Sequence, residues 1–264
     1  MSNSDIVFAG SIPEIYDAHL VPLLFEPYAA ALAPRVAASD PLDVLETAAG
    51  TGALTRALAP LLASSARYVV SDLNEPMLQR AAARQGADPR ITWRQADAMQ
   101  LPFGAAAFDS VCCQFGAMFF PDRVAAYREV LRVLRPLGKF HFSVWDRIEE
   151  NDFSRAVTEA AAAFFPADPP QFLVRAPHGY HDVRRVEADL RDAGFSNISI
   201  ETVTLRSTAP TRAFPPLRYA RAPRCATKSR PAIRRRSTPS PSARPPRSRA
   251  PTAPAPSPAK CGPI

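Results

Sequence analysis

Short apolar runs alternate with stretches of helical periodicity along the first 205 residues. Strands are predicted where apolar positions are continuous or alternate, at residues 42–45, 67–71, 91–95, 108–114, 138–145 and 197–205. Helices are predicted where helix-forming residues and helical spacing dominate, at residues 53–63, 75–85, 121–134, 151–165 and 182–193. Because strands alternate with helices, parallel βαβ units are expected. The predicted fold class is α/β, with a three-layer, doubly wound, mostly parallel sheet.

The segment before the first strand is predicted to be helical. Residues 12–37 carry apolar side chains at helical spacing, which gives this segment a broad apolar face. Pro22 and Pro27 are expected to break or kink the helix, because proline lacks the backbone N–H and its ring clashes within a helix.

Composition changes abruptly near residue 207. From Arg206 to Ile264 the chain has fourteen Lys or Arg and no Asp or Glu, and from Ser207 on it has fourteen prolines. The first 205 residues therefore hold eighteen basic and all twenty-five acidic residues, a net charge of −7, although the whole chain carries +7. Since large apolar residues are sparse there, residues 207–264 cannot bury enough surface to offset their ordering entropy and are expected to be disordered.

Two other interpretations of this tail stay open. Its positive charge could bind phosphate groups non-specifically, but Phe214 and Tyr219 are its only aromatic pair and it has no recognition motif. Specific nucleic-acid binding is therefore not expected. Alternatively, translation of a GC-rich gene in a shifted frame would remove every acidic residue in this way, and reading the DNA in the other frames would test that hypothesis.

The chain shows no sign of a membrane span or of a secreted, disulfide-bonded protein. It has no run of eighteen apolar residues, and MSNSDIVFAG lacks the basic stretch and apolar run of a signal peptide. Its four cysteines, Cys112, Cys113, Cys225 and Cys261, have no metal-ligand spacing, so no metal site is predicted. Adjacent Cys112 and Cys113 are expected to be buried on opposite faces of a strand. A cytoplasmic location is predicted.

Residues that can bind a nucleoside follow three successive predicted strands. The first strand leads into Glu46-Thr-Ala-Ala-Gly50-Thr-Gly52, where glycines permit positive φ and close approach of a ligand. Asp72 ends the second strand, where a carboxylate can accept hydrogen bonds from both ribose hydroxyls. Asp97 and Ala98 follow the third, where an acid could accept from an adenine amino group. Ligands of open α/β sheets bind at the carboxyl ends of strands, so these signals indicate one cofactor site.

Each residue also has an interpretation without a ligand. Gly50 and Gly52 could form only a tight turn, and Asp72 could cap the next helix. Asp97 could be a loop residue, and Glu46 a buried carboxylate. Their joint order and spacing favour the cofactor site. A nicotinamide-dependent oxidoreductase would share the turn and the acid, but no Tyr-x-x-x-Lys type pair and no second nucleotide-binding half are recognisable.

The turn resembles the first motif of class I S-adenosylmethionine-dependent methyltransferases. The resemblance continues through Ser71-Asp-Leu-Asn-Glu-Pro-Met77, Gln95-Ala-Asp-Ala-Met-Gln-Leu-Pro-Phe103, Phe108-Asp-Ser-Val and Tyr127-Arg-Glu-Val-Leu-Arg-Val-Leu-Arg-Pro-Leu-Gly138. The chain is similar to the group that includes ubiquinone- and menaquinone-biosynthesis methyltransferases (methyltransferase type 11/25 domain). The resemblance covers residues 10–206, is most specific over 42–145, and implies S-adenosylmethionine as the cofactor.

The resemblance implies a role for each position of the site. The methionine end of the cofactor would face Glu46, Ala48, Gly50, Thr51 and Gly52. The ribose would be held by Asp72, and the adenine would contact Leu73, Met77, Asp97 and Ala98. The sulfonium would lie above Gln114 and Phe115. Two positions depart from the family pattern, because Ala48 replaces the commonest first glycine and Leu137 replaces a usual glycine after Arg135-Pro136.

The chain is expected to divide into four parts. Residues 1–41 would form an N-terminal helical cap, 42–146 the cofactor-binding core, 147–206 the remaining helices and strand six, and 207–264 the Pro/Arg/Ser/Ala-rich tail. The family's sheet has a seventh, antiparallel strand between strands five and six. Since residues 207–264 show no strand pattern, this strand is predicted to be missing and catalytic activity to be impaired.

The predicted activity is methyl transfer by in-line displacement to a small, partly apolar acceptor. Alignment alone can supply about 7–11 kcal/mol of the barrier, so a dedicated base is optional and no catalytic residue is assigned. Aromatic and apolar residues that could contact the acceptor, or belong to the core instead, are Tyr16, Met118, Phe119, Phe120 and Trp145.

Four histidines are candidate bases by residue type alone. His141 alternates with two phenylalanines on a strand and is expected in the core, while His178 and His181 flank a Gly-Tyr turn and are expected to be solvated. His19 lies in the N-terminal segment. No oligomeric state is predicted.

Overall fold

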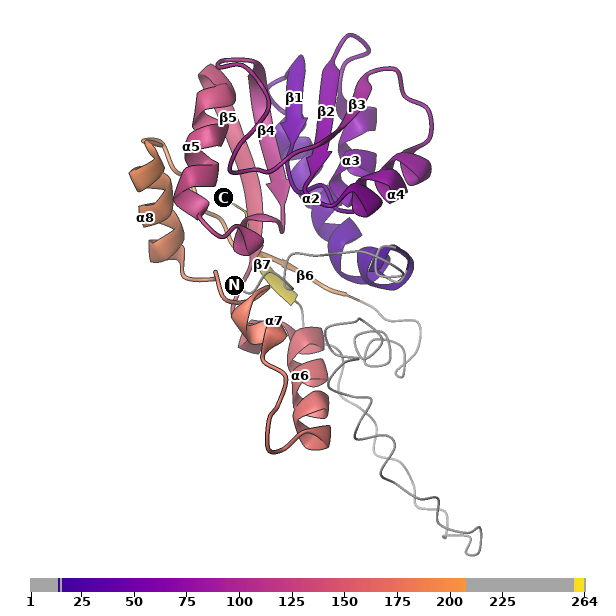
Figure 1. Cartoon of the computed structure of the whole chain (residues 1–264), viewed down its shortest axis with the longest axis vertical. Coiled ribbons are helices and arrows are strands. Elements are labelled where there is room, and N and C mark those ends of the chain that lie inside the picture. The colour runs from indigo at the N-terminus through magenta and orange to yellow at the C-terminus, as the bar shows by residue number, and fades with distance from the viewer. Residues whose placement is uncertain (1–13, 15, 208–258, 264) are drawn as a thin grey trace, which may run out of the picture.

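The computed structural model describes residues 14, 16–207 and 259–263. Its middle layer is a seven-stranded sheet in the order β3-β2-β1-β4-β5-β7-β6 (Figure 1). The strands are β1 (Asp43–Glu46), β2 (Arg67–Asp72), β3 (Ile91–Gln95), β4 (Phe108–Gln114), β5 (Leu134–Trp145), β6 (Val203–Leu205) and β7 (Ala259–Pro263). Strands β1 to β5 are parallel, and β7 is antiparallel to β5 and to β6. The α/β prediction is confirmed.

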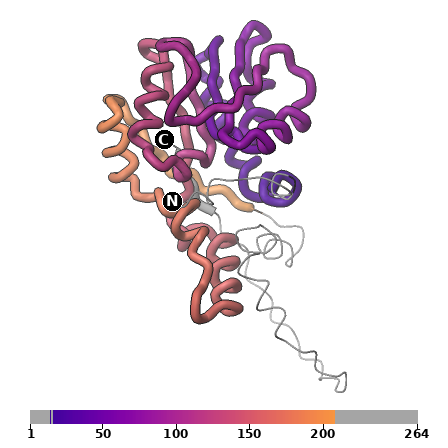
Figure 2. Tube along the Cα trace, viewed as in Figure 1, coloured from indigo at the N-terminus to yellow at the C-terminus, as the bar shows by residue number. Residues whose placement is uncertain are grey.

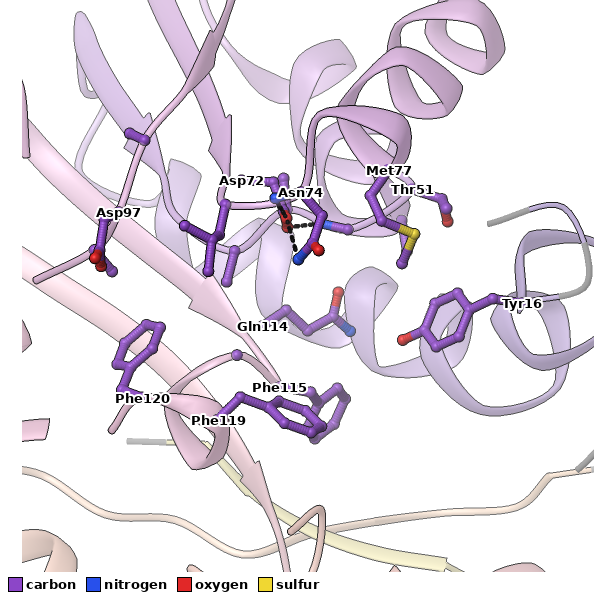
Figure 3. Close-up of a pocket in the computed structure, with 18 of the residues that line it drawn as sticks. Tyr16, Thr51, Asp72, Asn74, Met77, Asp97, Gln114, Phe115, Phe119 and Phe120 are labelled. Atoms are coloured by element: carbon purple, nitrogen blue, oxygen red, sulfur yellow. Dashed lines mark hydrogen bonds between the residues drawn. The ribbon is translucent and has the colours of Figure 1, made fainter. Parts of the chain in front are cut away.

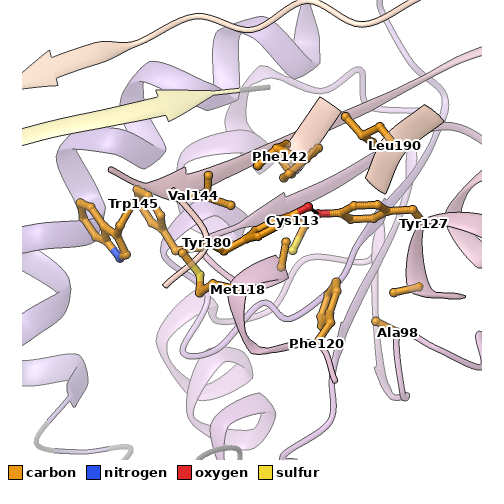
Figure 4. Packing of buried hydrophobic residues seen from close by; sticks show 14 of the residues in the cluster. Ala98, Cys113, Met118, Phe120, Tyr127, Phe142, Val144, Trp145, Tyr180 and Leu190 are labelled. Carbon is orange, nitrogen blue, oxygen red and sulfur yellow. Dashed lines mark hydrogen bonds between the residues drawn. The ribbon is translucent and has the colours of Figure 1, made fainter. Parts of the chain in front are cut away.

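Helices cover both faces of this sheet. They are α2 (Glu26–Ala37), α3 (Ala53–Leu58), α4 (Glu75–Gln85), α5 (Arg123–Val133), α6 (Asp152–Phe164), α7 (Phe172–Arg175) and α8 (Val183–Ala193). Helices α2, α3 and α4 enclose one core with β1 and β2, around Leu32, Leu58 and Leu78. Helices α5 and α8 enclose the other, in which Tyr127 and Leu190 pack with residues of β4 and β5 (Figure 4). Figure 2 shows α6 and α7 extending away from the sheet.

The N-terminal segment is helical as predicted, but it consists of two helices that meet between the two prolines. Residues Tyr16–Phe25 form a π-helix, η2, with Pro22 inside it, and α2 begins at Glu26. The break is therefore at Phe25. Pro27 does not break the second helix, because it occupies the first turn, where a backbone N–H has no helical partner to lose.

Strand β5 begins four residues earlier than predicted and contains an irregularity. Its register with β4 shifts between the pairs Phe108–Leu134 and Ser110–Lys139. Leu137, within the shift, has φ +68° and is 99 % exposed. A left-handed backbone costs an L-residue about 1–2 kcal/mol, so the replacement of the family's glycine at this position has an energetic cost.

The prediction that the seventh strand is missing is wrong. Strand β7 lies between β5 and β6, with Trp145 opposite Cys261 and Val203 opposite Cys261 on the other side. The strand pattern could not reveal it, because residues 259–263 read Ala-Lys-Cys-Gly-Pro and contain no large apolar side chain. Pairing with two neighbours uses backbone groups that every non-proline residue carries. The expectations of disorder and of a shifted reading frame concern mainly residues 208–258, which are outside the described part of the chain, and the predicted domain boundaries stay predictions.

The two cysteines of β4 are buried on opposite faces of the sheet, as predicted. Cys112 packs in the core beneath α2 and α3, and Cys113 in the core beneath α5 and α8. Both are free thiols with no solvent exposure. Burial raises the pKa of the Cys113 thiol to about 12, so this side chain acts as a small apolar residue.

Candidate cofactor and acceptor site

A pocket lies where β1, β2, β3 and β4 end, beneath the N-terminal segment η2 (Figure 3). Ten of the twelve predicted cofactor residues line it, namely Ala48, Gly50, Thr51, Asp72, Leu73, Met77, Asp97, Ala98, Gln114 and Phe115. The two others, Glu46 and Gly52, are not among its lining residues. The topology therefore brings the carboxyl ends of four strands to one cavity, as expected for a parallel sheet.

The turn after β1 has left-handed backbone at three positions. Ala48, Gly50 and Gly52 have φ of +51°, +58° and +79°. A Cβ on Gly50 would meet only Met77 Cε, at 3.9 Å, so no protein atom fills the space beside it and a ligand can approach the backbone. Thr51 Oγ1 is buried and has no hydrogen-bond partner among the described residues, which leaves it available to a ligand in this pocket.

Gly52 serves packing rather than the pocket. A Cβ at this position would lie 3.0 Å from Ala81 Cβ, on α4. The glycine therefore lets the start of α3 approach α4 closely. Gly52, the last glycine of the motif, is therefore needed for helix packing, which the spacing of the motif did not show.

Asp72 connects the end of β2 with the glycine turn. Its Oδ2 accepts a hydrogen bond from the Gly50 N–H at 2.8 Å, and its Oδ1 accepts one from the Asn74 N–H at 2.7 Å. Burial raises the pKa of this carboxyl, while the Asn74 and Gly50 hydrogen bonds oppose the shift. Asn74 Nδ2 also donates to Oδ1, at 3.4 Å, so of the about four acceptor sites of a carboxylate about one remains for a ribose hydroxyl. The N-cap of α4 is Asn74, not Asp72, so Asp72 is not itself the capping residue, although it accepts from the Asn74 N–H just before the helix.

Asp97 lies at the far end of the cavity, in the loop after β3. Its Oδ1 accepts a hydrogen bond from the Met99 N–H at 2.8 Å and so fixes the turn that exposes Ala98 to the pocket. The residue is thus both a loop residue and a lining residue. Its second carboxylate oxygen has no hydrogen bond within the described chain and can accept one from an adenine amino group.

Glu46 is turned away from the pocket. It is 1 % exposed, and its Oε2 accepts hydrogen bonds from the Tyr68 hydroxyl and from Thr55 Oγ1, the latter at 2.7 Å. Burial raises the pKa of this carboxyl to about 7, with the hydrogen bonds from Tyr68 and Thr55 acting against the rise. The carboxyl supports the turn from behind, between α3 and β2, instead of facing the cavity.

The remaining wall of the pocket is aromatic. Tyr16, Phe119 and Phe120 line it as expected of acceptor contacts, together with Gln114 and Phe115 (Figure 3). Gln114 Nε2 donates a hydrogen bond to the Phe25 carbonyl at 2.9 Å and so ties β4 to the end of η2.

Two other predicted acceptor residues, Met118 and Trp145, belong to the core instead. They are 0 % and 7 % exposed and do not line the pocket. The Trp145 ring stacks on that of Phe115, with centroids 3.8 Å apart and an interplanar angle of 2°. It therefore fixes the pocket wall from behind.

Gly116 allows the end of β4 to lie close to the turn after β1. A Cβ on this residue would lie 2.4 Å from Ala48 Cβ and 2.8 Å from Cys113 Sγ. Sequence reasoning missed this residue, although it follows two predicted ones. It also missed eight further lining residues, of which Ala49, Ala53, Asn74, Ala96 and Met99 lie within or beside quoted motifs. Val21, Phe25 and Pro121 had no motif signal and were brought in by the fold.

None of the four candidate histidines lines this pocket. The expectation that His178 is solvated is wrong, since it is 4 % exposed and its Nδ1 lies 2.7 Å from the Asp146 carbonyl oxygen. The turn that carries it packs against Trp145, which sequence spacing could not reveal. His181 is exposed as expected. His141 is half-buried, and burial lowers its pKa to about 4, with Lys139 contributing.

Comparisons with known proteins agree with this geometry. Residues 45–142 match the family model described as a methyltransferase domain. A ubiquinone/menaquinone biosynthesis C-methyltransferase of Pseudomonas putida is 28 % identical over 185 residues, which cover 66 % of this chain and 72 % of that protein.

Solved structures share the fold. The YcgJ protein of Bacillus subtilis superposes with a TM-score of 0.52 at 20 % identity, covering 80 % of this chain and 85 % of its own. A phosphoethanolamine N-methyltransferase of Haemonchus contortus, solved with S-adenosylhomocysteine, gives 0.53 at 19 % identity, covering 74 % and 43 %. The nicotinamide alternative has no support among these relatives. Residues 45–142 thus carry a methyltransferase domain, and the chain is similar to S-adenosylmethionine-dependent methyltransferases.

Proposed function

We propose that this enzyme methylates a small, partly apolar acceptor held between Tyr16, Phe119 and Phe120. The observation that carries the proposal is the division of the pocket. Its wall after β2 and β3 offers the carboxylates of Asp72 and Asp97, and the wall that faces them is aromatic, with Phe119 and Phe120 (Figure 3). A nucleoside fits against the first wall, and a flat, weakly polar molecule fits against the second.

The proposed cofactor contacts follow from the hydrogen-bonding capacity of each residue. Asp72 accepts from a ribose hydroxyl, and Asp97 accepts from the adenine amino group. Thr51 Oγ1, which is buried without a hydrogen-bond partner in the described chain, binds the polar methionine end together with the backbone at Gly50. Gln114 and Phe115 lie below the sulfonium. Glu46 supports the turn without contact, because its carboxyl is already engaged by Tyr68 and Thr55.

Bound S-adenosylmethionine supplies an electrophilic methyl group on its sulfonium. The protein's part in the reaction is to align the acceptor for in-line attack and to exclude water from the cavity. Titratable side chains among the described lining residues are Asp72, Asp97 and Tyr16, and both carboxylates lie on the wall proposed for the nucleoside. The acceptor therefore provides its own nucleophilic atom, such as an electron-rich ring carbon. Carbon methylation is also the reaction named for the Pseudomonas putida relative.

Two measurements test this function. Isothermal titration should detect binding of S-adenosylhomocysteine and none of NADH. A screen that follows formation of S-adenosylhomocysteine should find turnover with hydroquinones or phenols and none with free nucleotides or amino acids. Reaction with highly charged acceptors alone would contradict the proposed acceptor class.

Location is the remaining part of the proposal. No helix in the described part of the chain is long and apolar enough to cross a membrane. Cys112 and Cys113 are free thiols, which is the usual state in a reducing compartment. We therefore propose a cytoplasmic enzyme without specific nucleic-acid binding. Recovery in the membrane fraction after gentle lysis, or salt-resistant retention on DNA, would contradict this assignment.

A further inference from the structure

A cluster of charged side chains lies between the N-terminal segment and two core helices, outside the pocket. Asp17 of η2 is 0 % exposed, and its Oδ2 accepts hydrogen bonds from Arg80 Nε at 2.8 Å and from Arg84 Nη1 at 3.1 Å. Its Oδ1 lies 3.9 Å from Arg56 Nη2. A fully buried carboxylate is tolerated only where cations compensate it, so the arginines fix the position of Asp17.

Every element that meets in this cluster also lines the pocket. Tyr16, the neighbour of Asp17 in η2, points into the cavity from the N-terminal segment (Figure 3). Helix α4, which carries Arg80 and Arg84 one turn apart, also carries the lining residue Met77. The cluster therefore connects two elements that line the pocket, η2 and α4.

Arg56 extends the connection to the glycine turn. It lies on α3, and its Nη1 donates a hydrogen bond to the Thr51 carbonyl at 2.6 Å. Its Nη2 lies 3.8 Å from Oε1 of Glu26, whose side chain is 44 % exposed. Three guanidinium groups thus face two carboxylates, of which Asp17 alone is fully buried. Removing Asp17 would leave the three cations close together without their main counter-charge.

The far end of η2 has a second attachment. Gln114 Nε2 donates to the Phe25 carbonyl at 2.9 Å, while Asp17 is held at the near end. Between these points Pro22 interrupts the backbone donors of the π-helix. Leu23 and Leu24 of η2 are buried in the core, so apolar packing and the two attachments together hold the segment beside the cavity.

We propose that Asp17, Arg80 and Arg84 are positioning residues whose ion pairs hold η2 closed over the bound cofactor, with Tyr16 as the covering side chain. This inference rests on the proposed function, since it takes S-adenosylmethionine as the occupant of the pocket. Opening of η2 must precede release of the cofactor, so the strength of the ion pairs controls the residence time. The effect belongs to the dissociation rate more than to the association rate.

The test compares Arg80→Gln, Arg84→Gln and the double variant with the full-length wild-type protein. Arg155→Gln is the matched control, because Arg155 also pairs with two carboxylates, those of Asp152 and Glu159, but lies on α6. Dissociation of S-adenosylhomocysteine is followed by stopped-flow fluorescence of Trp145, which stacks on the lining residue Phe115. Hydrogen exchange of residues 16–25 is measured in parallel.

The double variant is expected to release S-adenosylhomocysteine about tenfold faster, with faster exchange in residues 16–25, while Arg155→Gln behaves as wild type. Arg84→Lys should bring the dissociation rate most of the way back from its value in Arg84→Gln to that of the wild type. A folded double variant with an unchanged dissociation rate would overturn the proposal. If the wild type binds no S-adenosylhomocysteine, the proposed function fails. In that case hydrogen exchange still tests whether the ion pairs hold η2. Exchange of residues 16–25 that is unchanged in the double variant rejects this attachment, and faster exchange supports it.

Discussion

The two halves of the pocket are built by different means. In the cofactor half, hydrogen bonds join residues at neighbouring strand ends, such as Asp72 with the backbone of Gly50 and Asn74. In the acceptor half, aromatic rings meet from distant segments, with Phe25 packed edge-on against Phe115 at 5.7 Å between centroids. The geometry of the first half depends on directional hydrogen bonds, which need specific atoms at specific angles. That of the second depends on the shape of the rings and on the apolar area that they bury.

This difference explains why the cofactor can be identified and the acceptor only by class. A hydrogen-bonded site tolerates few residue types, so its motif is visible in the chain. An aromatic wall can be made from many apolar residues of suitable size. The four predictions below test the boundary between the halves.

Glu46 lies behind the cofactor half and tests whether that half includes it. Burial raises its pKa from 4.5 to about 7, so its contribution to stability is fully present below pH 4.5 and is lost as pH rises to about 7. Glu46→Gln keeps an acceptor for Tyr68 and Thr55 and removes the buried charge. It should raise the free energy of unfolding above pH 7 by about 3 kcal/mol, measured by urea denaturation from pH 4 to 8.

The same variant should bind S-adenosylhomocysteine as the wild type does. Weaker binding without a gain in stability would place Glu46 in direct contact with the methionine end of the cofactor, as the family resemblance implies, and would show that its carboxyl reorients on binding.

Asp72→Ala removes the carboxylate at the centre of the cofactor half. The dissociation constant of S-adenosylhomocysteine should rise about 100-fold, because hydrogen bonds to a charged acceptor contribute about 1.5–3 kcal/mol. Isothermal titration measures the change. Asp88→Ala is the control, since Asp88 is an acid paired with Arg90 outside the pocket. Equal affinities of the two variants would remove Asp72 from the proposed ribose contacts.

Gly116→Ala tests the close contact of Gly116 with Ala48 and Cys113, where the two halves meet. The added Cβ would overlap Ala48 Cβ and Cys113 Sγ, so the free energy of unfolding should fall by about 2 kcal/mol. Adding Ala48→Gly removes one of the two clashes and relaxes a left-handed alanine, so the double variant should recover at least half of the loss. Additive effects in this double-mutant cycle would contradict this close contact.

Phe119→Ala should act on the acceptor half alone. With a hydroquinone acceptor, KM should rise about tenfold as apolar contact is lost, while the affinity for S-adenosylhomocysteine changes by less than about twofold. Phe164→Ala, at a 73 % exposed position on α6, should change neither quantity. If Phe119→Ala weakened binding of S-adenosylhomocysteine by the same factor as it raised KM, the two halves would not be separate.

Much of the core fold could be predicted from apolar periodicity. The bounds of β3, β4 and α4 coincide with the predicted residues, because each is a short, continuous pattern ended by proline, glycine or polar residues. The N-terminal helix was predicted with a break or kink at Pro22 or Pro27, whereas the helix type changes between Phe25 and Glu26 and both prolines lie inside helical segments. Strand β7 was missed because its pairing is a backbone property.

The sequence by itself predicted that the residues of the proposed cofactor half line one pocket. Gly50, Asp72 and Asp97 follow successive parallel strands, and the geometry of a parallel sheet brings such strand ends together without further information. Only the tertiary structure decided which way Glu46 turns, that His178 is buried, and that Asp17 meets Arg80 and Arg84. Each of these depends on contacts between elements far apart in the chain, whose packing no local pattern encodes.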